Sequence, residues 1–419
     1  MSGAASVPAV DCKAGVNVRD GAAALKIAVV SKALPLAESG QSRVLQLLCG
    51  ALPDCACWFL SCETEARHWE AMDGQPFGSV RLAARPRGWA WVRTLPLLGR
   101  LLAWGLTVAT LLRRARQIAR ALRHMDASVV VACTGDLLDI PAAALAARHA
   151  GVPLLLYLFD DYQYQWMGLQ RTAAAWFERM AIRAAAGAIA PNELLAAAYR
   201  ERHGISVAIV RNPVHPAAMS APAEPARRTW PVASLVYTGS IYHAHFDAFA
   251  RLVAALQSLE GRAALHIYTS QLAAVLREHG IAGPVHHHSY VEPADVFQVQ
   301  RAADILFLPL AFASKIPEVV RTSAPGKLGE YLAAGRPILV HAPADAFVSR
   351  FLRERGCGFV VDRPDVGALR EAVLYLLDDP AHGALLAQRA REVAREFALP
   401  QAVAALRGAL LAALLPHPR

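Results

Sequence analysis

The chain has 419 residues, a length that predicts roughly two or three domains. Hydrophobic residues make up 55% of the chain and charged residues 18%, a balance that excludes a disordered protein. The formal net charge of +9 favours partners that carry phosphate, which include nucleotide sugars, anionic lipids and nucleic acids, and charge alone does not choose among them.

The first 24 residues and the cysteines bear on the cellular compartment. Residues 1–24 contain no continuous apolar stretch after a basic start, so we predict no secretory signal and interpret them as a loose extension. The seven cysteines are an odd number without the paired spacing of a zinc site. Free thiols in a reducing, cytoplasmic compartment are the expectation.

Residues 25–213 alternate short apolar runs with helical segments, which predicts a parallel sheet wrapped by helices. The predicted strands are 26–30, 129–133, 154–159, 187–190 and 207–210. The predicted helices are 43–52, 141–150 and one that starts at residues 191–193. Ligands of such sheets bind beyond the carboxyl ends of the strands. The loop after the first strand lacks G-x-G-x-x-G, so nothing favours a dinucleotide.

Residues 85–123 combine arginines with tryptophan and leucine. Apolar positions from 97 to 112 follow helical spacing, and the uninterrupted apolar run 101–112 is too short for a bilayer span of about 20 residues. The arginines of the C-terminal part are Arg113, Arg114, Arg116, Arg120 and Arg123. The segment predicts either contact with an anionic membrane surface or a core helix with a solvated basic end.

The strand 154–159 ends in a polar and aromatic segment that runs from Asp160 to Trp166. The sequence is not the D-x-D metal motif, and adjacent carboxylates at a strand end diverge, so they do not form the facing pair of carboxylates that a glycosidase uses. We predict catalytic roles for Asp160 and Asp161, near the reacting centre, and acceptor binding by the rings of Tyr162 and Trp166. A capping aspartate pair with surface aromatics is the structural alternative.

Five prolines between residues 213 and 231 make helix and central strand unlikely there and mark the best domain boundary, with a linker at 214–231. A second alternation of strands and helices follows, from 232 to 398. The predicted strands are 235–238, 265–269, 285–289, 305–309, 338–340 and 358–361. The predicted helices are 246–259, 293–302, 327–334, 346–355, 366–377, 383–397 and 400–414. Three adjacent histidines, 286–288, face alternate sides of a strand, so we interpret them as structural.

The stretch from Thr322 to His341 predicts a loop that ends at Gly326, a short helix and a strand. Gly335 stands where a left-handed C-cap belongs. Lys327 and Glu330 share one face of the first helical turn, where free N–H groups favour an anion. The cation suits a diphosphate and the carboxylate suits ribose hydroxyls, as in a sugar nucleotide.

This stretch resembles the donor-site signature of family 4 glycosyltransferases, in the variant branch with Pro-x-Lys-Leu-x-Glu-Tyr. Glu330 matches the second glutamate of the commoner E-x(7)-E form, and residues 334–337 match the x-Gly-x-Pro part of the Ala-x-Gly-x-Pro tail that follows it in the family. Thr322 stands where the first glutamate is usual.

The resemblance implies an α/β GT-B fold, in which two Rossmann-like domains face each other across a cleft. The domains would be 25–213 for the acceptor and 232–398 for the nucleotide sugar, with residues 399–419 crossing back onto the first. It implies a retaining hexosyl or related transferase of surface polysaccharide or glycolipid synthesis. A nucleotide-diphosphate sugar would be the donor, a glycan or lipid-linked molecule the acceptor, and neither metal nor cofactor would be required.

The resemblance also implies particular contacts. The residues implied at the donor are Gly239, Ser240, Lys315, Lys327, Glu330, Tyr290 and Val291. Gly40, in the first loop, and Arg43, directly after that loop, would contact the acceptor or a phosphate, and a plain structural loop is the alternative. No lysine or arginine lies between Gly239 and Arg251, so either His243 and His245 or Lys315 and Lys327 would supply charge to the diphosphate.

Two alternatives stay open. The departures at Thr322 and after Gly239 are compatible with a catalytically silent GT-B-like binding or scaffold protein. A sugar-nucleotide epimerase would share the architecture. We expect no nucleic-acid partner, because only residues 85–123 mix basic and aromatic side chains and they form no recognised module. We expect a cytoplasmic protein that contacts the membrane face peripherally.

Overall fold

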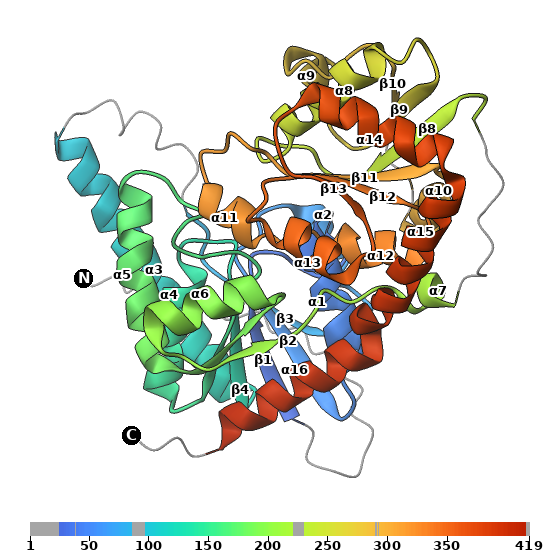
Figure 1. Cartoon of the computed structure of the whole chain (residues 1–419). Helices are drawn as coiled ribbons and strands as arrows, with labels where there is room; N and C mark the ends of the chain where they lie inside the picture. Colours follow the sequence, from blue (N-terminus) through green and yellow to red (C-terminus); the bar gives the residue numbers. More distant parts are fainter. Residues whose placement is uncertain are drawn as a thin grey trace, which may run out of the picture. The chain divides into compact units, whose positions relative to one another are not determined.

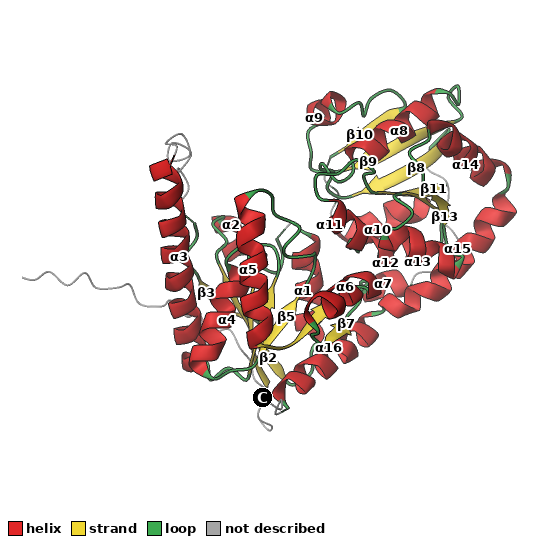
Figure 2. Ribbon diagram, turned by 60° about the vertical axis from the view of Figure 1, so that its left-hand side comes forward, coloured by secondary structure: helices red, strands yellow, loops and turns green. Residues whose placement is uncertain are grey.

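The computed structural model describes residues 25–37, 39–85, 97–220, 230–289, 291 and 293–415. The chain forms two compact units, Met1–Val210 with Val403–Arg419, and Arg211–Ala402. Each unit contains one parallel sheet covered by helices (Figure 1, Figure 2). The predicted α/β fold with two Rossmann-like domains is confirmed.

The first unit has a seven-stranded sheet in the order β3-β2-β1-β4-β5-β6-β7, and all neighbouring strands are parallel. The strands are β1 (Leu25–Val30), β2 (Cys55–Ser61), β3 (Gly78–Arg81), β4 (Val129–Cys133), β5 (Leu154–Tyr157), β6 (Ala185–Ala190) and β7 (Val207–Ile209). The helices are α1 (Gly40–Ala51), α2 (Ala66–Glu70), α3 (Leu97–His124), α4 (Asp139–Ala150), α5 (Leu169–Ala184) and α6 (Glu193–His203).

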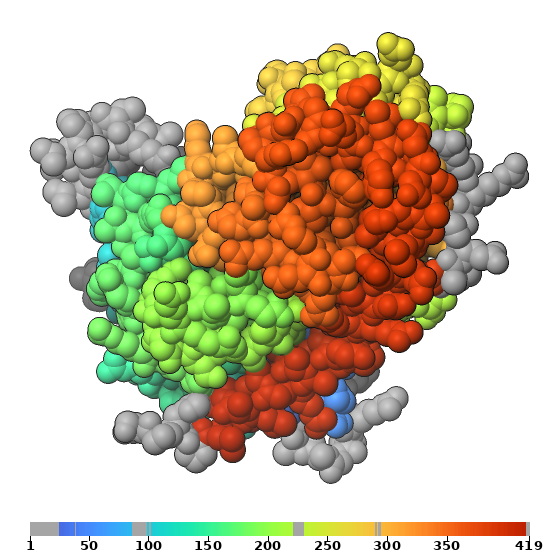
Figure 3. All heavy atoms as spheres, in the orientation of Figure 1, coloured from blue at the N-terminus to red at the C-terminus, as the bar shows by residue number. Residues whose placement is uncertain are grey.

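Both faces of this sheet are buried, which explains why its strands read as continuous apolar runs. Ala28 and Val30 of β1 belong to the core that α3 and α4 cover. Ile27 and Val29 face the opposite way, toward side chains of α1 and of α16 (Leu399–Leu414). From Val403 on, α16 belongs to this unit, and its outer side lies at the surface (Figure 3).

The second unit has a six-stranded parallel sheet in the order β10-β9-β8-β11-β12-β13. The strands are β8 (Ala233–Thr238), β9 (Ala263–Tyr268), β10 (Val285–His288), β11 (Ile305–Pro309), β12 (Ile338–His341) and β13 (Phe359–Val361). The helices are α7 (Pro216–Met219), α8 (Phe246–Gln257), α9 (Ala273–Glu278), α10 (Pro293–Ala302), α11 (Pro317–Thr322), α12 (Lys327–Ala334), α13 (Phe347–Arg355), α14 (Val366–Asp378) and α15 (Pro380–Ala394).

Several local predictions were wrong or incomplete. The loop predicted before Gly326 contains α11, and the proline-rich linker contains α7, while residues 221–229 lie outside the described residues. Both helices have proline in the first turn, where its missing N–H is not needed by the helix. Strands β2 and β3 and helix α5 were not predicted.

Candidate functional site

The strand order of each sheet marks where a ligand is expected. Successive strands proceed outward from β8 on one side and from β11 on the other, so the order reverses between β8 and β11. The same reversal occurs between β1 and β4 in the first unit. Open α/β sheets bind ligands beyond the carboxyl ends of their strands at such switch points. A ligand is therefore expected at the loops after β8, β11, β1 and β4.

Gly239 and Ser240 form the loop directly after β8, and both are exposed. Gly239 has a φ of +118°, a conformation that glycine adopts without strain. Its N–H donates to the Tyr268 carbonyl at 2.8 Å, and the Tyr237 hydroxyl donates to the carbonyl oxygen of Ser240 at 2.6 Å. The loop is thus held at both of its residues by the end of the sheet.

Lys327 is the first residue of α12 and lies against this loop. Its Nζ donates to the Tyr237 hydroxyl at 2.7 Å and lies 4.1 Å from the centre of that ring. A Cβ on Gly239 would come within 3.3 Å of Nζ, so the amine borders the glycine backbone. Burial lowers the pKa of Lys327 to about 7, an effect that Glu330 opposes. A bound anion would favour the charged form of this lysine.

Glu330 lies one turn further along α12 and is half-buried. Its Oε2 accepts a hydrogen bond from Nε2 of Gln300 at 3.0 Å. The next residue, Tyr331, accepts from the backbone N–H of Thr238 at 3.1 Å through its hydroxyl. The start of α12 is therefore fastened to the end of β8, which keeps Lys327 and Glu330 next to the Gly239 loop.

The other residues predicted at the donor are less enclosed. Lys315 is exposed on the loop after β11, Val291 is half-buried, and Tyr290 lies outside the described residues. His245 is buried, and burial together with Lys327 lowers its pKa to about 3, so it is neutral at physiological pH. Of the two ways to supply charge beside Gly239, the geometry favours Lys327 over His245.

In the first unit, Gln41 joins the two loops at the switch point. Its Nε2 donates to the Ser31 hydroxyl at 3.1 Å and to the Thr134 carbonyl at 3.0 Å. Gly40 begins α1 and is exposed, and a Cβ added to it would meet no atom of the described residues within 4 Å. Arg43, predicted beside Gly40 at the acceptor, is half-buried one turn into the same helix. Gln41 thus links the loops after β1 and β4, where a ligand is expected, and Gly40 and Arg43 lie next to it in α1.

Asp160 follows β5 at the same end of the sheet. Its backbone N–H and that of Phe159 donate to the Thr134 hydroxyl, at 3.3 and 3.0 Å. Asp160 as a residue is half-buried, and its carboxylate has no hydrogen-bond or ion-pair partner among the residues that the structure describes. Burial, with a contribution from Asp161, raises the pKa of Asp160 to about 6. Asp160 is therefore available to a ligand.

Asp161, in contrast, points into the protein. Arg202 binds its two carboxylate oxygens at 3.1 and 2.6 Å and also donates to Glu178 at 2.9 Å. His203 and Tyr199 reach Glu178 at 2.7 Å each. Asp161 is 1% exposed, so its carboxylate is enclosed by protein. The catalytic role predicted for Asp161 stays a prediction, and the geometry favours Asp160.

The two aromatic residues predicted at the acceptor are also mostly enclosed. Tyr162 is fully buried, and its hydroxyl donates to the Leu137 carbonyl. Trp166 is half-buried and packs against the core of the first unit, with the Arg85 guanidinium 5.9 Å from its ring centre. Trp166 is thus the better placed of the two to offer part of a ring to a ligand.

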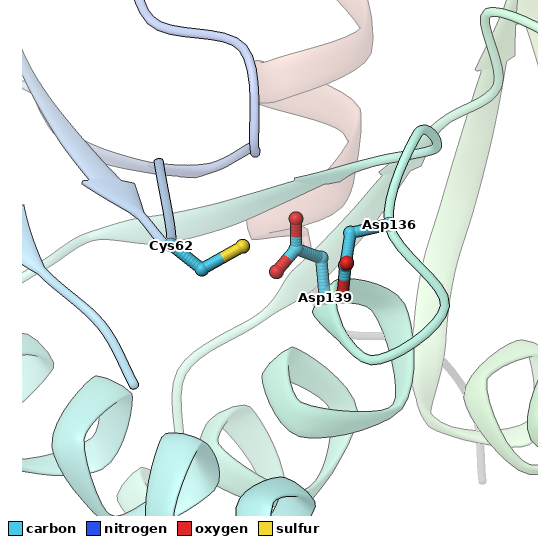
Figure 4. A group of neighbouring side chains, drawn as sticks. All are labelled: Cys62, Asp136 and Asp139. Atoms are coloured by element: carbon cyan, nitrogen blue, oxygen red, sulfur yellow. The ribbon is translucent and has the colours of Figure 1, made fainter. Parts of the chain in front are cut away.

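A group of Cys62, Asp136 and Asp139 has ligand atoms close enough for a metal ion (Figure 4). Arg114 forms ion pairs with both Asp136 and Asp139, and its Nη1 lies 2.6 Å from an oxygen of each. Arg114 holds the pKa of Asp136 low, whereas burial raises the pKa of Asp139 to about 7. We interpret the group as a buried ion pair that joins α3 to α4.

Arg114 corrects one interpretation of the sequence, since its side chain is fully buried and does not belong to a basic surface. The rest of α3 presents an exposed face, on which Leu102, Val108 and Leu112 are 53%, 46% and 43% exposed. Exposed arginines follow along the helix, namely Arg113, Arg116, Arg120 and Arg123. Residues 86–96 of the predicted membrane segment lie outside the described residues. None of the helices searched in the described chain is long and apolar enough to cross a bilayer.

A cavity of about 780 Å³ lies elsewhere in the second unit. Asp304 and Pro337, which line it, directly precede β11 and β12. The cavity is therefore at the amino end of these strands, away from the Gly239 loop.

Residues 233–379 match the family model "Glycosyl transferases group 1". No curated protein matches the chain in sequence.

Solved structures resemble the whole fold. HepE of Anabaena, in complex with UDP-glucose, has a TM-score of 0.66 and 13% identity, covering 92% of this chain and 99% of its own. A glycosyltransferase of Rickettsia africae has a TM-score of 0.63 and 13% identity, and the match covers 93% of this chain and 99% of the other. WaaG, a glycosyltransferase involved in lipopolysaccharide biosynthesis, has a TM-score of 0.62 and 15% identity, and the match covers 91% of this chain and 98% of the other. The chain thus has the fold of GT-B glycosyltransferases, and its residues 233–379 carry the sequence pattern of the group 1 glycosyl transferases.

Proposed function

We propose that the protein is a glycosyltransferase that moves a sugar from a nucleotide-diphosphate sugar to a glycan or lipid-linked acceptor. The observation that carries the proposal is the placement of Lys327 and Glu330 near the Gly239 loop, at the switch point of the second sheet. These residues lie within the stretch that matches the group 1 family model. The similar fold of HepE, which binds UDP-glucose, supports a nucleotide sugar as the donor.

In this proposal the second unit binds the donor. Lys327 and the N–H of Ser240 stabilise the negative charge that builds on the diphosphate as the sugar leaves. Glu330 accepts hydrogen bonds from the ribose hydroxyls and so fixes the position of the donor. We assign the donor stretch to the family 4 variant branch, with retention of anomeric configuration and without a metal or cofactor.

The first unit contributes the acceptor side. Asp160 accepts the proton of the acceptor hydroxyl, a role for which a carboxylate with a pKa of about 6 is suited. Gly40, Arg43 and Trp166 contact the acceptor. Asp161 holds the loop through Arg202 and does not itself react.

We infer that the acceptor is lipid-linked and that the α3 face contacts an anionic, cytoplasmic membrane surface during surface polysaccharide or glycolipid synthesis. Exposed leucine and valine followed by exposed arginines support this, because such a face can insert apolar side chains and attract anionic headgroups. The lipopolysaccharide role of WaaG supports the same class of acceptor.

The main test measures release of nucleoside diphosphate from UDP-, GDP- and ADP-sugars in the presence of a membrane lipid extract. We expect release from one donor, a loss of about a hundredfold in Glu330→Ala, and no loss in Glu371→Ala, an exposed helical glutamate of the same unit. Donor binding without turnover would instead support a scaffold protein, and conversion of the donor sugar without release would support an epimerase. Equal activity of Glu330→Ala and wild type would refute the site.

The membrane proposal is tested with charge reversal. Arg113, Arg116 and Arg120 are changed together to Glu, which we expect to weaken sedimentation with phosphatidylserine vesicles by about a hundredfold, at about 1 kcal/mol per arginine. The matched control reverses three exposed arginines of the second unit, Arg350, Arg363 and Arg370. Equal sedimentation of the two variants would exclude α3 as the contact.

A further inference from the structure

Gln300 is a fully buried side chain on α10 that joins the end of β8 to Glu330. Its Nε2 lies 3.0 Å from Oε2 of Glu330 and 3.0 Å from Oγ1 of Thr238. It is 0% exposed, so water does not replace these two bonds. A buried amide in this place needs a physical reason, because burying a polar group costs free energy unless it is hydrogen-bonded.

The orientation of the amide follows from its partners. An ionised carboxylate only accepts hydrogen bonds, so the NH2 group and not the oxygen of Gln300 faces Glu330. The second hydrogen of that NH2 group then reaches the Thr238 hydroxyl. The oxygen, Oε1, is buried without a hydrogen-bond partner among the described residues. The site thus leaves one acceptor unsatisfied in order to hold both donors toward Thr238 and Glu330.

The neutral amide has a particular consequence for Glu330. A lysine or arginine in its place would hold the carboxylate but would also neutralise its charge. Gln300 restricts the rotation of the carboxylate while leaving it negatively charged. A fixed, charged carboxylate is a strong acceptor for hydroxyl donors, and its side-chain entropy is already lost before the ligand arrives.

We propose that Gln300 is a positioning residue that orients Glu330 toward the vicinal hydroxyls of the donor ribose. The inference rests on the proposed function, because it takes Glu330 as the ribose contact. Gln300 is buried and acts on the ribose through Glu330, while its second bond holds Thr238 at the end of β8. Its removal therefore weakens ligands that carry the ribose hydroxyls more than ligands that lack them.

The test compares the binding of UDP, GDP and ADP with that of their 2′,3′-dideoxy analogues by calorimetry. For the nucleotide that binds, Gln300→Leu is expected to weaken the ribose form on the order of tenfold, the value of a hydrogen bond to a charged group, and to weaken the dideoxy form less. The control is Gln388→Leu, because Gln388 also donates to a carboxylate, Glu392, at 3.2 Å but is exposed. In turnover, KM for the donor rises and kcat is unchanged.

A double-mutant cycle separates positioning from a general structural effect. Gln300→Leu is expected to add little in a Glu330→Ala background, since the carboxylate it orients is gone. Gln300→Asn, which keeps the amide but draws it back by one methylene, gives the same loss for the ribose form if the leucine variant does not fold. Equal weakening of both nucleotide forms, no weakening, or additivity with Glu330→Ala would overturn the inference. Failure of the wild-type protein to bind any of the three nucleotides would instead overturn the proposed function on which it rests.

Discussion

The two units each present a pair of charged residues, and the pairs behave differently. Lys327 and Glu330 are separated by one turn of α12. Lys327 borders the loop after β8, and Glu330 accepts a hydrogen bond from Gln300. Asp160 and Asp161 are adjacent after β5, and only Asp160 remains accessible, because Arg202 encloses Asp161. A regular helix brings residues three apart to one side, whereas adjacent residues at a strand end diverge.

The difference indicates that burial determines which members of a pair can contact a ligand. The buried member of the aspartate pair has a bidentate ion pair, so it stabilises the loop. The accessible member has a carboxylate without a partner in the described chain and a raised pKa. In α12 both members are half-buried, so both are suited to a ligand.

The largest expected effect is on the rate of transfer in Asp160→Asn. If Asp160 is the base, its loss slows transfer by about a hundred- to ten-thousandfold and leaves donor binding intact. In the wild type, kcat/KM should rise with pH through about 6, as the carboxyl group loses its proton, and the variant should lack this limb. The measurement is a pH profile of nucleoside diphosphate release with the lipid extract.

Stability provides the control for Asp160→Asn. A carboxyl group whose folded pKa is raised binds its proton more tightly folded than unfolded, so stability falls as pH rises through the folded pKa of about 6. Replacing Asp160 with Asn should therefore not destabilise the protein at pH 7.5. A variant with normal rates, or one whose loss of rate matches a loss of folded protein, would count against Asp160 as the base.

Asp161→Asn should have the opposite profile. The change leaves Arg202 and Glu178 without the carboxylate that completes their network, which we expect to lower the free energy of unfolding by about 3 kcal/mol. This is the lower end of the range for a broken buried pair, because Arg202 is 24% exposed. Urea denaturation of Asp160→Asn and Asp161→Asn side by side checks the contrast. Similar unfolding free energies for the two variants would contradict the division of roles.

Much of the donor end could be predicted from the sequence because its signals are local. The bounds of α12 and β11 match the prediction, and Gly335 has the predicted left-handed conformation, with a φ of 68°. Helix spacing and a C-cap involve residues within one or two turns, which sequence pattern reports directly. The fold class follows for the same reason, from repeated apolar runs and helices.

The remaining parts of the site depend on residues far apart in the chain. Gln300 lies 30 residues before Glu330, and Arg202 lies 41 residues after Asp161. Neither pairing has a local signature, since it arises only when two helices and a strand end pack together. The same applies to Arg114, which lies among surface arginines in the sequence but has its partners on α4 and in the loop before that helix.

Lys327 offers the smallest effect and the sharpest comparison with an exposed lysine. With a folded pKa of about 7, its charge is mostly lost between pH 7 and pH 8.5, so affinity for the nucleotide-diphosphate sugar should fall roughly five- to tenfold per pH unit. Such a sugar diphosphate does not itself titrate in this range, so the slope reports the protein. Lys327→Arg keeps a positive charge and should flatten the slope, whereas Lys315→Arg, at an exposed position, should keep it. The measurement is calorimetry across this pH range. If affinity does not change with pH in the wild type, or changes equally in Lys327→Arg, Lys327 does not bind the diphosphate, and Glu330 is the only one of the two residues of α12 that contacts the donor.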